Sequence, residues 1–250
     1  MSVKSAERRR RRGSGFSKAL LLLLLAAVTT IVAVSVFFRI STIKVVGNSK
    51  YTAEEVIAAS GLEIGGNLFS IKDTSVAISL RKELPYVDKV KLVRSLPDSV
   101  TIEIEESYPL ASFKTDDTVY IVNKSGKIID ETDETGALGT IELKGIEPIQ
   151  PRVGEKIALG DAGAAQLGFL IETLSAIMSA GIEEDITYLD AGKTNSLVFD
   201  YKGRFTVKMG GNENAVAKVS LLVDAVSRLE PSDRGDIDIS SENEARFVPG

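Results

Sequence analysis

Clustered carboxylates are the side chains of this sequence whose type and spacing are best suited to chemistry. Glu103, Glu105 and Glu106 lie close together, as the paired acids of a glycoside hydrolase would. Such a pair needs one carboxyl in an apolar pocket, but Glu103 and Glu105 alternate with apolar residues and so share the solvated face of a strand. The chain has no His and no Cys, which removes the Ser-His-Asp triad, thiol nucleophiles and most zinc sites. We therefore expect no catalytic residue, no metal and no cofactor.

Three shorter motifs have simpler structural explanations. Residues 41–44 have the S-x-x-K spacing of penicillin-interacting acyl-enzymes, but the sequence lacks the S-D-N and K-T-G partners. The acids of residues 130–134 offer ligands for Ca²⁺ but lack the Gly and the final Glu of an EF-hand loop. The glycines at 65–66 and 210–211 are not followed by the Lys-Ser/Thr of a phosphate loop. We therefore expect residues 41–44 to lie in a strand, residues 130–139 to form a charged loop, and the glycines at 65–66 and 210–211 to lie in turns.

One long apolar segment determines where the rest of the chain must lie. Residues 19–38 carry no charge and are long enough to cross the ~30 Å hydrocarbon core of a bilayer. The basic cluster Arg8–Arg12 precedes the segment, and the chain after it is acidic. The positive-inside rule then predicts an uncleaved anchor, with residues 1–18 in the cytoplasm and the bulk of the chain outside. A signal peptide cleaved after Ala33-Val34-Ser35 is the alternative, although the apolar run is long for one.

Residues 39–109 show the order strand, helix, helix, strand, strand. Thr52 to Glu55 form a capping box at the start of the first helix. The second helix is expected to begin near Asp73 or Thr74 and to end before Pro85. Two strands then flank the turn Pro97-Asp98, and the second of them alternates apolar and polar residues strictly.

Residues 110–250 are predicted to form a second, mainly β domain with two helices and a flexible end. Hairpin signals lie at residues 119–129 and 197–209. One helix is expected after Asp161 and another over residues 216–226. The predicted fold is therefore α+β, with one transmembrane helix, a β-α-α-β-β domain and a β domain.

Several segments, taken in order after a membrane span, carry a family likeness. They are Phe38–Asn48, Gly65–Phe69, Val90–Pro97, Val100–Glu106 with Pro109, Gly203–Gly210 before a helix containing Lys218, and Gly235–Ile239. Together they resemble the FtsQ/DivIB family of bacterial cell-division proteins, whose exported part begins with a POTRA domain. Ser107 and Ser240 stand where the family often has arginines, so contacts made by those arginines do not carry over.

The resemblance implies a scaffold at the division septum of the bacterial plasma membrane and no enzyme activity. Family members bind the bitopic coiled-coil proteins FtsB (DivIC) and FtsL, which regulate septal peptidoglycan synthesis. No nucleic acid or small-molecule substrate is expected. A membrane-anchored cell-wall enzyme and a POTRA-bearing secretion or assembly factor are the alternatives.

The candidate partner site lies at the carboxyl end. If Asp236–Glu242 is an edge strand, its outer backbone groups are unpaired and a partner segment can add beside it. Phe247 is the nearest large apolar residue able to anchor that segment. The predicted partner-binding residues are Asp236, Ile237, Asp238, Ile239, Ser240, Ser241, Glu242 and Phe247. Ile237 and Ile239 are equally consistent with ordinary core positions of a final strand.

Overall fold

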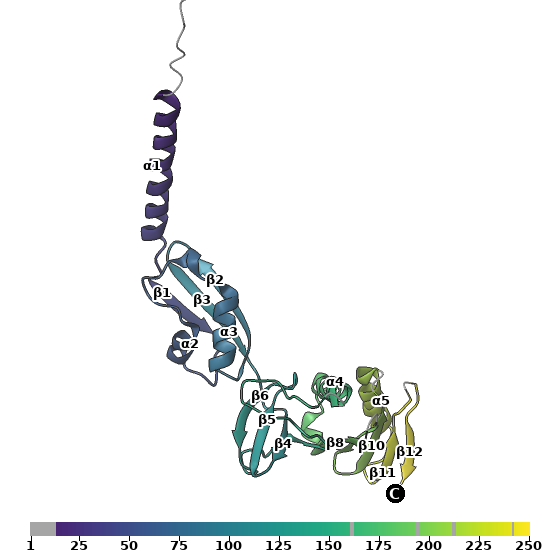
Figure 1. Ribbon diagram of the computed structural model, residues 1–250. Coiled ribbons are helices and arrows are strands. Elements are labelled where there is room, and N and C mark those ends of the chain that lie inside the picture. Colours follow the sequence, from purple (N-terminus) through teal and green to yellow (C-terminus); the bar gives the residue numbers. More distant parts are fainter. Residues whose placement is uncertain (1–13, 161–162, 194–195, 212–213, 242) are drawn as a thin grey trace, which may run out of the picture.

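A long helix and two folded units make up the described part of the chain (Figure 1). The computed structural model describes residues 14–160, 163–193, 196–211, 214–241 and 243–250. The basic cluster Arg8–Arg12 lies outside these residues. Helix α1 (Ser14–Phe37) projects away from the rest, and its stretch Lys18–Phe37 has a mean hydropathy of 2.8 with no part of it buried. By length and composition this helix can cross a membrane.

The first unit contains the predicted order strand, helix, helix, strand, strand, which is confirmed. Its elements are β1 (Thr42–Val46), α2 (Ala53–Ser60), the short helix η1 (Leu68–Ser70), α3 (Asp73–Glu83), β2 (Val87–Ser95) and β3 (Ser99–Glu106). Strand β3 is central, parallel to β1 and antiparallel to β2. The side chain of Thr52 accepts from the Glu55 N–H, and Glu55 accepts from the Thr52 N–H, so the predicted capping box is present. Ile102 and Ile104 of β3 pack against Val56 of α2, as strict alternation predicts.

In the residues that the structure describes, the second unit is one mixed nine-stranded sheet with two long helices. Its strands are β4 (Ala111–Thr115), β5 (Thr118–Val122), β6 (Ile128–Thr132), β7 (Ile141–Lys144), β8 (Tyr188–Lys193), β9 (Ser196–Tyr201), β10 (Phe205–Gly210), β11 (Gly235–Asp238) and β12 (Arg246–Pro249), and its helices are α4 (Ala164–Ala180) and α5 (Ala215–Ser227), with the short helix η3 (Glu183–Asp185). The spatial order is β12-β11-β10-β9-β8-β7-β4-β5-β6. Both predicted hairpins are present, as β5–β6 and β9–β10.

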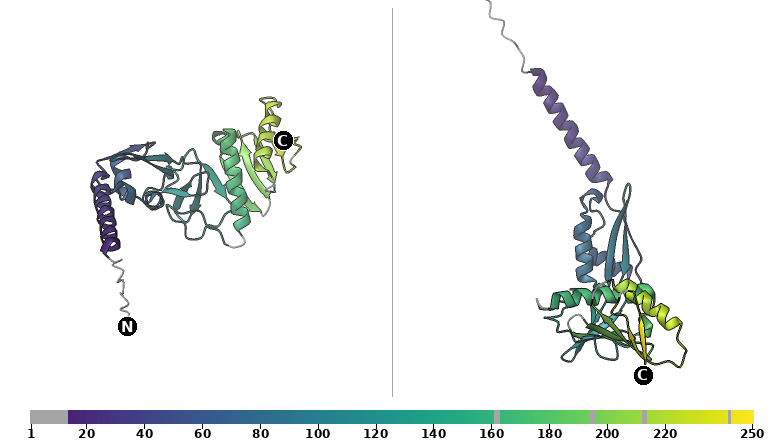
Figure 2. Two further views of the ribbon diagram at one scale, coloured as in Figure 1. Left: turned by 90° about the horizontal axis from the view of Figure 1, so that it is seen from above. Right: turned by 90° about the vertical axis from the view of Figure 1, so that its right-hand side faces the viewer.

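The core of the second unit lies between the sheet and its two helices. Figure 2 shows α4 and α5 together on one face, which leaves the other face of the sheet open. Leu170 and Leu174 of α4 share a buried cluster with Phe199 and Val207 of the sheet. The carboxyl end, which was expected to be flexible, contains strand β12.

Specific side-chain contacts join the two units. Tyr86, just before β2, donates its hydroxyl hydrogen to a carboxylate oxygen of Asp130 in β6 at 2.7 Å. The Lys127 ammonium donates to the Val87 carbonyl at 3.2 Å, and the Asn123 amide donates to the Ser107 hydroxyl at 2.8 Å. Burial raises the pKa of Tyr86, and the hydrogen bond to Asp130 raises it further, so the neutral phenol is favoured. Asp130, expected in a charged loop, is therefore a strand residue that ties the units together.

Candidate partner-binding edge

The predicted edge strand is not the edge of the sheet. Strand β11 is parallel to β10 on one side and antiparallel to β12 on the other. The expectation that Asp236–Glu242 leaves its outer backbone groups unpaired is therefore wrong. The chain reverses after the exposed residues Ser240 and Ser241, and Arg246–Pro249 then pairs beside β11. Glu242 lies outside the described residues.

Two glycines allow the backbones to come this close. Gly235 has φ +141°, and a Cβ there would collide with the Val248 carbonyl of β12. Gly210, at the end of β10 with φ +69°, likewise faces Ser240 directly. Both positions therefore favour glycine, because a side chain would separate the strands or strain the backbone.

Strand β12 lies at one edge of the sheet in the described part of the chain, opposite the edge formed by β6. The Gly250 N–H donates to the Arg234 carbonyl at 3.0 Å, which marks that pair as hydrogen-bonded. Since bonded and non-bonded pairs alternate in an antiparallel ladder, Arg246 and Val248 direct their backbone groups toward β11. The backbone N–H and C=O of Phe247 then point outward, where a partner strand would add.

The side chains at this edge separate into two faces. Ile237 and Ile239 are fully buried, so they are core residues. Phe247 is half-buried and packs edge-on against Phe205, with ring centroids 6.0 Å apart. Its ring therefore supports the edge, and its backbone is the more available part.

On the open face, charged groups are engaged with one another. Asp236 accepts from the Lys208 ammonium at 2.6 Å, and this hydrogen bond raises the pKa of Lys208. Hydrogen bonds from Ser240 lower the pKa of Asp238, including one from the Ser240 N–H at 2.9 Å. Both carboxylates thus stabilise the local structure of the edge.

Arg246 and Val248 are exposed residues of the edge that sequence reasoning missed. Val248 is 52% exposed and pairs with Asp236 on the open face. The only sequence signal was the short polar–apolar stretch after the serines, and four residues are too few to establish a strand.

The carboxylates first considered for catalysis have structural partners. Glu103 and Glu105 form exposed ion pairs with Lys91 and Lys89, at 2.7 and 2.9 Å. Glu106 accepts the backbone N–H groups of Ser49 and Lys50, at 3.0 and 2.7 Å, and so holds the chain that follows β1.

A cleft of about 340 Å³ lies between the two units and is lined in part by Asp88, Glu105 and Glu106. Two of these three acids are already engaged, Glu105 with Lys89 and Glu106 with backbone N–H groups. Among the residues that the structure describes, no group of three acidic side chains is arranged to hold a metal ion.

The sequence is similar to cell-division proteins named DivIB and FtsQ. The FtsQ-type POTRA domain family matches residues 38–107, which cover β1 to β3. The cell division protein DivIB of Clostridium botulinum (strain Hall) is 25% identical over 216 residues, which cover 84% of this chain and 82% of DivIB. Residues 38–107 belong to the FtsQ-type POTRA family. A second FtsQ/DivIB relative, the cell division protein FtsQ of Streptomyces venezuelae, is 27% identical over 83% of this chain and 73% of its own length.

A shorter match has higher identity. The cell division protein FtsQ of Corynebacterium glutamicum is 30% identical over 109 residues, which cover 44% of this chain and 48% of that protein. The first unit is thus an FtsQ-type POTRA domain. The partner-binding role of the carboxyl-terminal residues stays a prediction.

Proposed function

We propose that this protein is a non-catalytic scaffold of the bacterial division septum, anchored in the plasma membrane by α1. Its amino terminus lies in the cytoplasm, and its two folded units lie outside. The second unit binds FtsB/DivIC-like bitopic proteins, which bring FtsL-like partners and link the scaffold to septal peptidoglycan synthesis. Similarity to DivIB over 84% of this chain, the match to the FtsQ-type POTRA family and the long apolar helix α1 support this proposal.

The observation that carries the binding proposal is the outer side of β12. An outermost strand offers unpaired backbone donors and acceptors, and a partner segment satisfies them by adding as a tenth strand. This is a change from the predicted site, because the groups on offer are the N–H and C=O of Phe247 and the C=O of Pro249 rather than those of Asp236–Glu242. Val248 on the open face and the half-buried Phe247 ring supply apolar contact beside the added strand.

The orientation is tested by cysteine labelling, because the chain contains no cysteine of its own. In intact cells, a membrane-impermeant maleimide is expected to label Ser241→Cys at once. Ser5→Cys is expected to react only after the membrane is opened. The reverse pattern, or release of a soluble product that begins near Val36, would contradict the proposed anchor.

The binding edge is tested by removing one N–H group. Phe247→Pro deletes the outward donor, and proline is tolerated in an edge strand where its missing N–H faces away from the neighbour. We expect it to weaken capture of the extracytoplasmic segment of an FtsB-type protein about tenfold, the loss of about 1.4 kcal/mol typical of one backbone hydrogen bond. Capture is measured by pull-down over a concentration series of the segment.

Two variants serve as controls for this test. Phe247→Ala removes the ring but keeps the N–H, so its loss of binding is expected to be smaller. Ser241→Pro lies in the turn, outside both strands, and is expected to bind like the parent. Unchanged capture by Phe247→Pro, with the protein folded, would move the site away from β12.

A further inference from the structure

Three loops of the POTRA domain meet where the chain leaves α1. They are residues 38–41, 61–72 and 96–98, here called the membrane-proximal tip. Strands β1 and β3 are parallel, so their starting residues lie at the same end of the sheet. Figure 1 shows this end directly below α1.

Hydrogen bonds hold the tip to the residues that follow the apolar helix. The Leu68 N–H donates to the Phe38 carbonyl at 2.9 Å, and the Ile40 N–H donates to the Gly66 carbonyl at 2.8 Å. The Gly65 N–H donates to the Ile40 carbonyl at 2.7 Å. No free linker separates the helix from the tip, because Phe38 itself packs on the buried cluster around Leu68.

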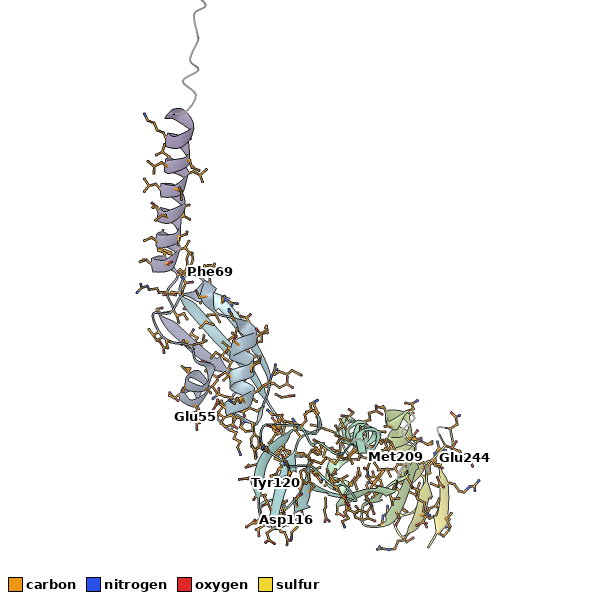
Figure 3. The ribbon with its side chains drawn as sticks, viewed as in Figure 1. Glu55, Phe69, Asp116, Tyr120, Met209 and Glu244 are labelled. Carbon is orange, nitrogen blue, oxygen red and sulfur yellow. The ribbon has the colours of Figure 1, made fainter. Side chains whose placement is uncertain are left out.

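The tip exposes large apolar side chains to solvent. Ile64 is 64% exposed, Phe69 is 56% exposed and Leu96 is 62% exposed, whereas Leu68 between them is fully buried. Edge-on contacts connect Phe37 at the end of α1 to Phe38, and Phe38 to Phe69, with ring centroids 5.6 and 4.9 Å apart. Figure 3 places Phe69 beside the end of α1.

We propose that the membrane-proximal tip docks on the lipid bilayer that α1 crosses, with Ile64, Phe69 and Leu96 inserted at the level of the headgroups. This inference rests on the proposed membrane anchor. The bilayer is the expected binding surface because the chain is continuous. The tip is hydrogen-bonded to the first residues beyond the apolar span, and these residues lie at the bilayer surface. Aromatic and aliphatic side chains at this depth bury apolar area, and aromatic rings favour the interface.

Because of the charges that the tip carries, we expect its docking not to depend on the charge of the lipid headgroups. The tip carries two basic residues, Arg39 and Lys72, and two acidic ones, Glu63 and Asp98, so its charges sum to zero. The tip therefore presents no excess of one sign, and its binding energy comes from apolar insertion. Zwitterionic lipid is expected to suffice, and added salt is expected to leave the docking unchanged.

The chain contains no tryptophan, so single tryptophans report on depth without background. The full-length Phe69→Trp protein is reconstituted into zwitterionic vesicles whose acyl chains carry bromine near the headgroup end. Compared with unbrominated vesicles, we expect the emission of this tryptophan to fall by roughly half, as for a ring at the interface. Leu96→Trp is expected to respond in the same way. Both proteins are checked for unchanged thermal unfolding first.

Two further tryptophan variants distinguish failure of the docking from failure of the membrane anchor. Ile31→Trp lies inside α1 and is expected to be quenched, whereas Val248→Trp on β12 is expected to remain bright. Quenching at Ile31 with tip tryptophans as bright as Val248→Trp would overturn the docking and leave the anchor intact. No quenching at Ile31 would overturn both the anchor and the docking.

Discussion

Ile102→Asp is expected to unfold the POTRA domain. Ile102 is fully buried in β3, the central strand of the three-stranded sheet, where it packs against Val56 and Leu80. An aspartate there leaves a carboxylate without a charged partner and removes the packing of the isoleucine. The combined cost is about 4 kcal/mol or more. That is a large share of the roughly 5–15 kcal/mol that stabilises an ordinary domain.

The neighbouring position gives a matched control. Thr101 is half-exposed on the opposite face of β3 and lies across from Lys44 of β1. Thr101→Asp therefore adds a charge that water and Lys44 accommodate, and we expect its stability to remain within about 0.5 kcal/mol of the parent. Denaturant unfolding of the full-length chain in detergent, followed by circular dichroism, measures both. Equal loss in the two variants would mean that the faces of β3 are wrongly assigned.

Lys218→Ala is expected to have the second largest effect. Lys218 of α5 is fully buried, and its ammonium donates to the carbonyls of Met209 and Gly211, at 3.2 and 3.0 Å. These carbonyls lie where β10 ends. The alanine removes a long packed side chain together with donors to two carbonyls, so we expect a loss of about 3 kcal/mol.

Lys218→Met separates packing from hydrogen bonding. Methionine keeps most of the volume but cannot donate, so its loss is expected to be smaller, about 1–2 kcal/mol. Hydrogen exchange, measured by mass spectrometry on the full-length chain, follows the amides of β10 and α5. We expect these amides to lose more protection in Lys218→Ala than in Lys218→Met. Unchanged protection in Lys218→Ala would show that the buried ammonium does not stabilise this edge of the sheet.

Local patterns were sufficient to predict most elements of the POTRA domain. The alternation of Val100, Ile102 and Ile104 identified both a strand and its buried face, because side chains in a strand alternate between two sides. The capping box at Thr52 located the start of α2, since both of its hydrogen bonds lie within four residues. Each of these signals is contained in a short stretch of sequence.

The candidate site depended on pairing that no short stretch contains. The apolar alternation of Ile237 and Ile239 predicted a strand, but its position in the sheet depends on Arg246–Pro249 returning beside it. A strand of four mostly exposed residues has almost no pattern of its own. The burial of Lys218 was unpredictable for a similar reason, because its carbonyl partners belong to a different element.

The direct passage from α1 into the POTRA domain has a geometrical consequence for any partner of β12. Phe38 directly follows the helix, where its N–H donates to the Val34 carbonyl, and its ring packs in the domain. The hydrogen bond from Tyr86 to Asp130 then fixes the next unit. With α1 in the bilayer as proposed, this arrangement holds the β12 edge at a fixed height above the membrane surface. A partner with its own membrane span that adds to β12 as proposed must then place its pairing segment at the same height. The length of chain between the span and that segment, as well as its sequence, then determines which proteins can bind.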